Sequence, residues 1–150
     1  MGVLNFKKGY KYRLTEDYVH QLGQDFVLKV EEIETPYVWL GEDGTLILKK
    51  GYTTDGPSGP TVDTNTFMRG AFVHDALYQL IRLGLLDKNT FRKAADKTLY
   101  RVCREDGMFW VRAVYVYWGV RVFGNKNATN RKSKPVISVA PKNVTDTTNN

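Results

Sequence analysis

The stretch TFMRGAFVHDALYQLIRLGL, residues 66–85, decides the fold class of this 150-residue chain. Its apolar and aromatic side chains recur in steps of four and three residues, which is the spacing of one face of an α-helix. One of Asp63, Thr64 and Asn65 is suited to cap the start of this helix, and Gly84 is suited to end it. The inward stripe consists of Phe67, Ala71, His74, Tyr78, Ile81 and Leu85.

Two further helices are predicted on the C-terminal side of this stretch. One starts near Asp87 or Asn89 and runs to Gly107. The segment 108–123 is apolar nearly all round, and its length favours a helix over a strand. It is too short to span a bilayer, and it contains two arginines. A helix of this kind must be covered on most sides, so it is either the central core element or a contact surface for another protein.

The N-terminal third has the pattern of β-strands. Alternating or short apolar runs lie at 10–15, 26–33, 36–40 and 46–48, and the glycines of the stretch 41–44 are suited to a hairpin turn. The predicted fold class is therefore α+β. We expect an N-terminal antiparallel sheet of three to four strands packed on about three C-terminal helices.

Composition predicts one domain over residues 1–124 and a flexible basic tail over 125–150, disordered or held by a partner. The net charge of +6 is concentrated in the tail, which has five lysines and arginines against one aspartate. The rest of the chain has 17 basic and 15 acidic residues, which argues against nucleic-acid binding. One cysteine and no signal-peptide pattern predict folding in a reducing cytosol rather than secretion.

The first helix carries the strongest candidate for chemistry. His74 lies on its inward stripe, Asp75 lies at the edge of that face, and Tyr78 follows one turn later. An antiparallel second helix would bring Asp96 to the far nitrogen of the imidazole. This arrangement orients a histidine as a base or metal ligand, but the same contacts also serve simply to pin a core together.

A second candidate is the loop 53–65, which leads directly into the histidine helix. Its Asp55 and Ser58, held by prolines and glycines, suit a cation or a phosphate. The alternative is that both side chains only form turns with their own backbone. If the loop folds over His74, then Asp55 and Asp75 become ligands for a divalent cation such as calcium.

These motifs resemble a phage and prophage family known as domain of unknown function 1353. The family pattern of a Thr/Ser-Asp-Gly-x-Ser-x-Pro loop, Ala-x-x-His-Asp-x-x-Tyr and Ala-Asp is matched in order over about residues 45–124. Pro57 stands where the pattern has a small residue. The resemblance implies a phage-encoded protein, made in the host cytoplasm and then carried in the virion, with no established activity. The matching residues are Thr54–Pro60, Ala71, His74, Asp75, Tyr78, Ala95 and Asp96.

The His-Asp-x-x-Tyr helix also has a local similarity to secreted phospholipases A2. That similarity implies His74 as the base, Asp75 as a calcium ligand, and Tyr78 and Asp96 as orienting partners. The chain departs from that family because it has no disulfides and no matching glycine-rich calcium loop.

Three functions follow from these observations. The first is a phage structural or assembly component, whose polar cluster is a structural clasp and whose contacts with other phage proteins are made by 108–123 and the tail 125–150. The second is a small metal-assisted hydrolase with His74 as general base. The third is a phage accessory protein that binds a small ligand in the same place.

Overall fold

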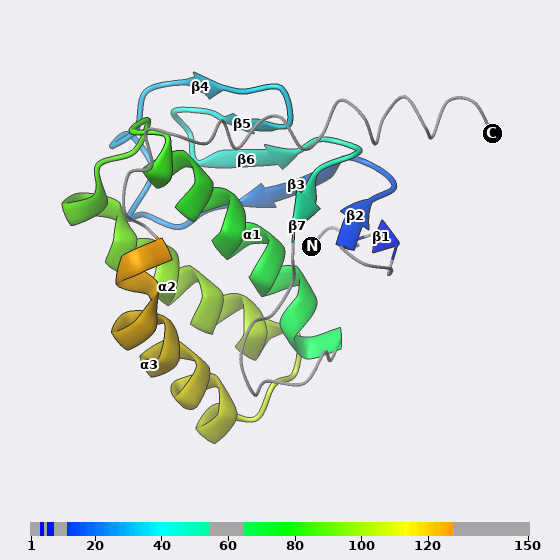
Figure 1. The fold of residues 1–150 in the computed structure, drawn as a ribbon, viewed down its shortest axis with the longest axis vertical. Helices are drawn as coiled ribbons and strands as arrows, with labels where there is room; N and C mark the ends of the chain where they lie inside the picture. The colour runs from blue at the N-terminus through cyan, green and yellow to red at the C-terminus, as the bar shows by residue number, and fades with distance from the viewer. Residues whose placement is uncertain (1–3, 5, 8–11, 55–64, 128–150) are drawn as a thin grey trace. The chain divides into compact units, whose positions relative to one another are not determined.

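The computed structural model describes residues 4, 6–7, 12–54 and 65–127 (Figure 1). They form two compact units, one made of strands up to residue 54 and one made of helices from residue 65. The predicted α+β class is confirmed, because antiparallel sheets in the N-terminal part are followed by three helices. The loop residues Asp55 and Ser58 and the tail from residue 128 lie outside the described residues.

The strand unit contains two small antiparallel sheets rather than one. The four-stranded sheet has the order β3-β6-β5-β4, and the three-stranded sheet has the order β1-β2-β7. The first sheet is made of β3 (Tyr18–Gln21), β4 (Ile33–Glu34), β5 (Val38–Leu40) and β6 (Thr45–Leu48). The second is made of β1 (Phe6–Lys7), β2 (Tyr12–Leu14) and β7 (Thr53–Thr54).

The register of the central hairpin places apolar side chains opposite each other. Leu40 pairs with Leu46, and Val38 pairs with Leu48. All four side chains are fully buried, because alternate residues of a strand point to the same face. The predicted turn is confirmed: the amide of Gly44, at a φ of 82°, donates to the carbonyl of Gly41 at 3.0 Å.

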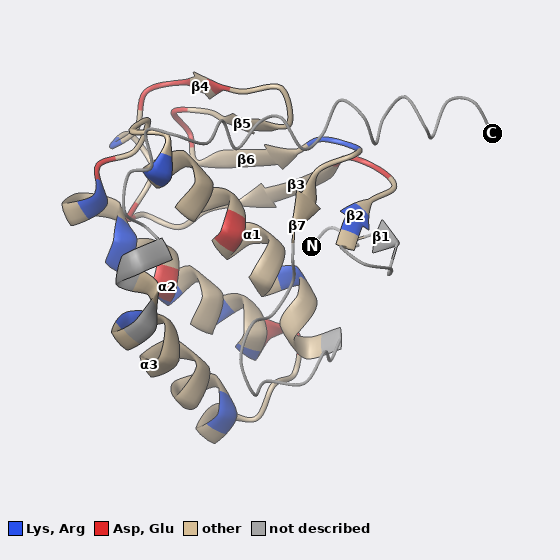
Figure 2. Ribbon diagram, in the orientation of Figure 1, with Lys and Arg blue, Asp and Glu red and all other residues tan. Residues whose placement is uncertain are grey.

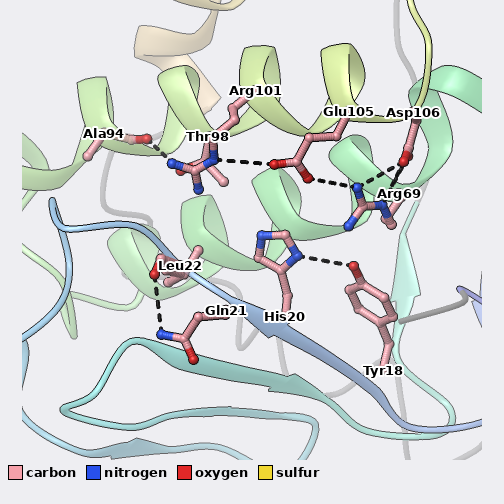
Figure 3. Close-up of polar contacts among 10 residues, drawn as sticks. All are labelled: Tyr18, His20, Gln21, Leu22, Arg69, Ala94, Thr98, Arg101, Glu105 and Asp106. Carbon is pink, nitrogen blue, oxygen red and sulfur yellow. Dashed lines mark hydrogen bonds and ion pairs between the residues drawn. The ribbon is translucent and has the colours of Figure 1, made fainter. Parts of the chain in front are cut away.

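One strand prediction, over 26–33, is wrong. Residues 26–30 form turns, in which Lys29 N–H donates to the carbonyl of Phe26 and Leu28 has a φ of 58°. Only Ile33–Glu34 of the expected strand pairs with a neighbour. The strand β3 was not predicted. Its histidine, His20, is buried, and its Nδ1 is 3.1 Å from the Tyr18 hydroxyl (Figure 3).

The helical unit follows the predicted boundaries closely. It consists of α1 (Asn65–Arg82), α2 (Lys88–Glu105) and α3 (Trp110–Asn127). Gly84 follows α1 with a φ of 76°, and Leu85, predicted to lie on the helical stripe, instead lies beyond the helix and is half exposed. Asp87 caps α2, because its side chain accepts from the Thr90 amide at 2.8 Å.

The three helices share one apolar core. Arg69 joins the start of α1 to the end of α2 (Figure 3). Its buried guanidinium donates two hydrogen bonds to the Asp106 carboxylate, at 2.8 and 3.0 Å, and also contacts Glu105. This contact crosses 37 residues of sequence and so fixes the two helices relative to each other. The core cluster consists of Phe67, Ala71, Leu99, Cys103, Met108, Ala113 and Val116.

Candidate functional site

Helix α1 places His74 and Tyr78 on the same inner face. The two residues are one helical turn apart, and their ring centroids are 4.1 Å from each other. Both side chains are buried, with His74 only 6% exposed. Asp75 lies next to them, and its side chain is 37% exposed.

Helix α2 brings Asp96 to these two rings. Its carboxylate is completely buried, and its Oδ1 lies 2.7 Å from Nε2 of His74. The Tyr78 hydroxyl donates to the same oxygen at 2.6 Å. A buried carboxylate is costly unless it is paired and hydrogen-bonded, and these contacts meet that requirement for one of its two oxygens.

Helix α3 supplies the partner of the second oxygen. The Arg121 guanidinium donates to Oδ2 of Asp96 at 3.0 Å. Arg92 of α2 donates in turn to the backbone carbonyl of Arg121 at 2.6 Å, which fastens this part of α3 to α2. Gly124 leaves room for the tyrosine, because a Cβ at this position would lie 2.7 Å from the Tyr78 hydroxyl. The site is thus built by all three helices.

The contacts favour the charged forms of Asp96 and His74 over their neutral forms. Burial raises the pKa of Asp96, but the hydrogen bonds and charge of His74, with the hydrogen bonds of Tyr78 and Arg121, outweigh burial and lower it. Burial lowers the pKa of His74, but the interactions with Asp75 and Asp96 outweigh burial and raise it. The pKa of Tyr78 is raised by burial and by Asp96, so its hydroxyl stays protonated and remains a donor.

The protonation state of Asp96 fixes the tautomer of the neutral imidazole. An ionised carboxylate only accepts hydrogen bonds, so Nε2 of His74 must carry the proton between them. In neutral His74 the lone pair is then on Nδ1. This nitrogen lies 3.9 Å from Oδ1 of the partly exposed Asp75, a separation that one bridging water can span. The geometry is that of an oriented base with a carboxylate beside its free nitrogen.

The structure therefore brings three of the sequence-predicted residues, His74, Tyr78 and Asp96, into direct contact and places Asp75 next to them. The predicted loop ligands Asp55 and Ser58 fall outside the described residues. Within residues 12–54 and 65–127, no group of three or more histidine, cysteine or acidic side chains is placed to hold a metal ion. The expected cation at Asp55 and Asp75 therefore stays a prediction.

Sequence reasoning missed the contribution of α3. Arg121 was considered only as an obstacle to spanning a bilayer, and Arg92 and Gly124 were not singled out. A usable signal existed, because an arginine in a largely apolar helix needs a partner when it is mostly buried, and Asp96 is the buried carboxylate nearby. Cys103 is buried, and burial raises the pKa of its thiol to about 12, so it is not a reactive nucleophile.

A sequence model of the family described as "Protein of unknown function (DUF1353)" matches residues 31–120, and the chain belongs to this family. The match begins just before β4 and includes His74, Tyr78 and Asp96, whereas Arg121 lies one residue beyond it. The resemblance found in the sequence is thereby confirmed for the family. Neither the curated proteins nor the solved structures contain a significant match to the chain.

Proposed function

We propose that this protein is a small hydrolase in which His74 acts as the general base. The observation that carries the proposal is the 2.7 Å contact between Nε2 of His74 and Asp96. It directs the basic lone pair to Nδ1, on the side of the partly exposed Asp75. Histidine is the most frequent general base because its pKa lies near neutrality, and a carboxylate behind the ring stabilises the imidazolium that forms.

The chemistry assigned to these residues is the activation of a water molecule. Nδ1 of His74 takes a proton from water while the water oxygen bonds to an electrophilic carbon or phosphorus atom. The bond to the leaving group then breaks, and the imidazolium returns its proton to that group. Asp96 is a positioning residue in this scheme, and Tyr78 and Arg121 hold Asp96 in place and ionised.

A calcium-assisted version of this reaction has limited support from the described residues. Of the two carboxylates predicted as ligands, only Asp75 is described, and one partly exposed carboxylate does not make a divalent-cation site. The proposed base therefore rests on His74 and its two neighbouring carboxylates alone.

The test compares the hydrolysis rates of the wild-type full chain and of the variant His74→Asn on two chromogenic probes. These are p-nitrophenyl butyrate, an ester, and bis(p-nitrophenyl) phosphate, a phosphodiester. Removing a general base lowers the rate by about 100-fold or more. The wild-type rate should rise with pH through the pKa of His74, because only the neutral imidazole accepts a proton. His20→Asn is the matched control, since it removes the other buried histidine and should leave the rate unchanged. Equal rates for wild type and His74→Asn on both probes, including no turnover by either, would reject the proposal.

A second candidate is a phage structural or assembly component, in which Asp96 is only a clasp that joins the three helices. The observation that favours it is the complete burial of a carboxylate that accepts from α1 and from α3 at once. In this candidate the protein moves from the host cytoplasm into the virion, and 108–123 and 125–150 contact other phage proteins. Deleting 125–150 should then release it from purified particles; unchanged association with particles contradicts this candidate.

A further inference from the structure

The outer side of α3 is an apolar surface. We call it the α3 face, and its side chains are 50–65% exposed. Four of its residues follow each other in steps of four, three and four along the helix, so they form one stripe. The α3 face consists of Phe109, Trp110, Val111, Tyr115, Trp118 and Val122. Of the two alternatives for segment 108–123, a central core element and a contact surface, the exposure favours the second, because only the other side of the helix is buried.

A contiguous exposed apolar surface of this kind marks an interaction site. The side of α3 that packs inward carries Ala113 and Val116 in the helical core and Arg121 at Asp96. Half of the helix thus suffices to hold it in place. The other half lies outside the core cluster, and its large aromatic side chains remain more than half exposed.

The charged residues of α3 and of the α2 edge beside it are basic. Helix α3 has no acidic residue (Figure 2). Its half-buried Arg112 lies in the sequence between Val111 and Tyr115 of the stripe. The adjoining edge of α2 exposes Lys93, Lys97 and Arg104. The two helices meet along this edge through the ring contact of Tyr100 with Tyr117, which in turn contacts Trp118. A partner for this surface must offer apolar area bordered by negative charge.

We propose that the α3 face binds the surface of an anionic phospholipid bilayer. Tryptophan and tyrosine favour the boundary between headgroups and acyl chains, and lysines and arginines bordering such rings are attracted to anionic headgroups. The stripe is the outside of a single helix, and a bilayer can mould itself to a helix surface, whereas a protein partner would need a matching groove. The observations therefore favour lipid over protein.

The helix would lie in the plane of the bilayer surface and not cross it. No helix within residues 65–127 is long and apolar enough to cross a membrane. From Val111 to Val122 the stripe extends over roughly 17 Å at the rise of an α-helix. The buried side of α3, with Arg121 at Asp96, would keep its contacts. Binding therefore requires neither His74 nor hydrolysis, and the inference is independent of the proposed function.

The test is sedimentation of the full chain with phospholipid vesicles. One preparation contains phosphatidylcholine with 30% phosphatidylglycerol, and the other contains phosphatidylcholine alone. We expect binding to the anionic vesicles to exceed binding to the neutral ones at least about tenfold at 0.1 M salt and to weaken at 0.5 M salt, because salt screens the cations. The emission of Trp110 and Trp118 should shift to shorter wavelength on binding. Equal binding to both preparations, or binding to neither, would overturn the proposal.

Two double variants locate the surface. Trp110→Ser with Trp118→Ser should lower the partition coefficient about tenfold or more, and so should Lys93→Gln with Lys97→Gln. Val19→Ser is the matched control, because it removes an apolar side chain of similar exposure from the strand unit. His74→Asn should bind the vesicles like wild type. If the tryptophan variant keeps its vesicle binding, or loses only an association with phage particles, the α3 face is not a lipid surface.

Discussion

The strand unit and the helical unit bury different kinds of side chain. In the four-stranded sheet the central contacts are between aliphatic residues, such as Leu40 with Leu46. In the helical unit the central contact among all three helices is a buried ionised carboxylate, and a broad apolar surface is left outside. Sheets and helices both satisfy most of their backbone groups internally, so the difference lies in the side chains: the central hairpin packs aliphatic residues, whereas the three helices meet at a polar cluster in which Asp96 is paired on both oxygens.

The two regions also differ in charge. Residues 1–54 carry seven lysines and arginines and eight acidic residues, whereas residues 65–127 carry eleven and five. The positive charge of the helical part was hidden when residues 1–124 were counted together. Residues 1–124 taken together are nearly neutral, whereas residues 65–127 taken alone are clearly basic. Only the charge of the helical unit taken alone points to an anionic partner.

The largest expected effect that tests this comparison is the loss of the buried carboxylate. Asp96→Ala leaves His74 and Arg121 without their partner and should lower the free energy of unfolding by about 3–5 kcal/mol. Chemical denaturation followed by circular dichroism measures it. Asp25→Ala, an exposed carboxylate of the strand unit, is the control and should change stability by less than about 0.5 kcal/mol. A loss below about 1 kcal/mol for Asp96→Ala would show that the cluster is not what holds the helices together.

The strand unit should respond to the loss of aliphatic packing instead. Leu48→Ala removes a fully buried side chain opposite Val38 and Tyr18, and should cost about 2–4 kcal/mol. The cost should be nearly the same at pH 5 and pH 8, because the side chain that is removed has no titratable group. Val19→Ala, which is half exposed on the neighbouring strand, should cost much less. A strong pH dependence for Leu48→Ala contradicts the distinction between the two units.

Two glycines of α3 give a paired test of how tightly the cluster is packed. At Gly124 a methyl group would meet the Tyr78 hydroxyl at 2.7 Å, so Gly124→Ala should destabilise by about 1–3 kcal/mol. At Gly119 nothing lies within 4 Å, so Gly119→Ala should stabilise by about 0.5–1 kcal/mol through helix propensity. Thermal unfolding of both variants measures the difference. Equal effects of the two substitutions would mean that α3 does not press against Tyr78.

The smallest expected effect is on the pH dependence of stability. The pKa of His74 is raised in the folded protein. Its contribution to the free energy of unfolding is therefore fully present below its pKa in the unfolded chain and is lost as pH rises through its pKa in the folded protein. The pKa of Asp96 is lowered in the folded protein. Its contribution to the free energy of unfolding is therefore present above its pKa in the unfolded chain and is lost as pH falls through its pKa in the folded protein. Stability should therefore be highest between these two limits. In His74→Gln the decline on the alkaline side should be reduced; an unchanged alkaline decline would assign it to another group.

Local patterns in the sequence determined the elements and part of the site. The spacing of apolar residues in steps of four and three determined α1 and placed His74 beside Tyr78. Asp87 determined the start of α2, and the glycines of the stretch 41–44 determined the hairpin turn. The contact of His74 with Asp96 was also foreseeable, because two helices joined by a short connection pack antiparallel. The roles of these residues in catalysis stay predictions.

Only the tertiary structure decided which side of α3 is buried and what completes the site. The segment 108–123 is apolar nearly all round, so its sequence has no preferred inner face. The buried side follows from where α2 presents Asp96 and Arg92 and where Tyr78 requires a glycine. Periodicity is a property of neighbouring residues, whereas these contacts join residues 25 or more positions apart, and such contacts form only when whole helices have packed.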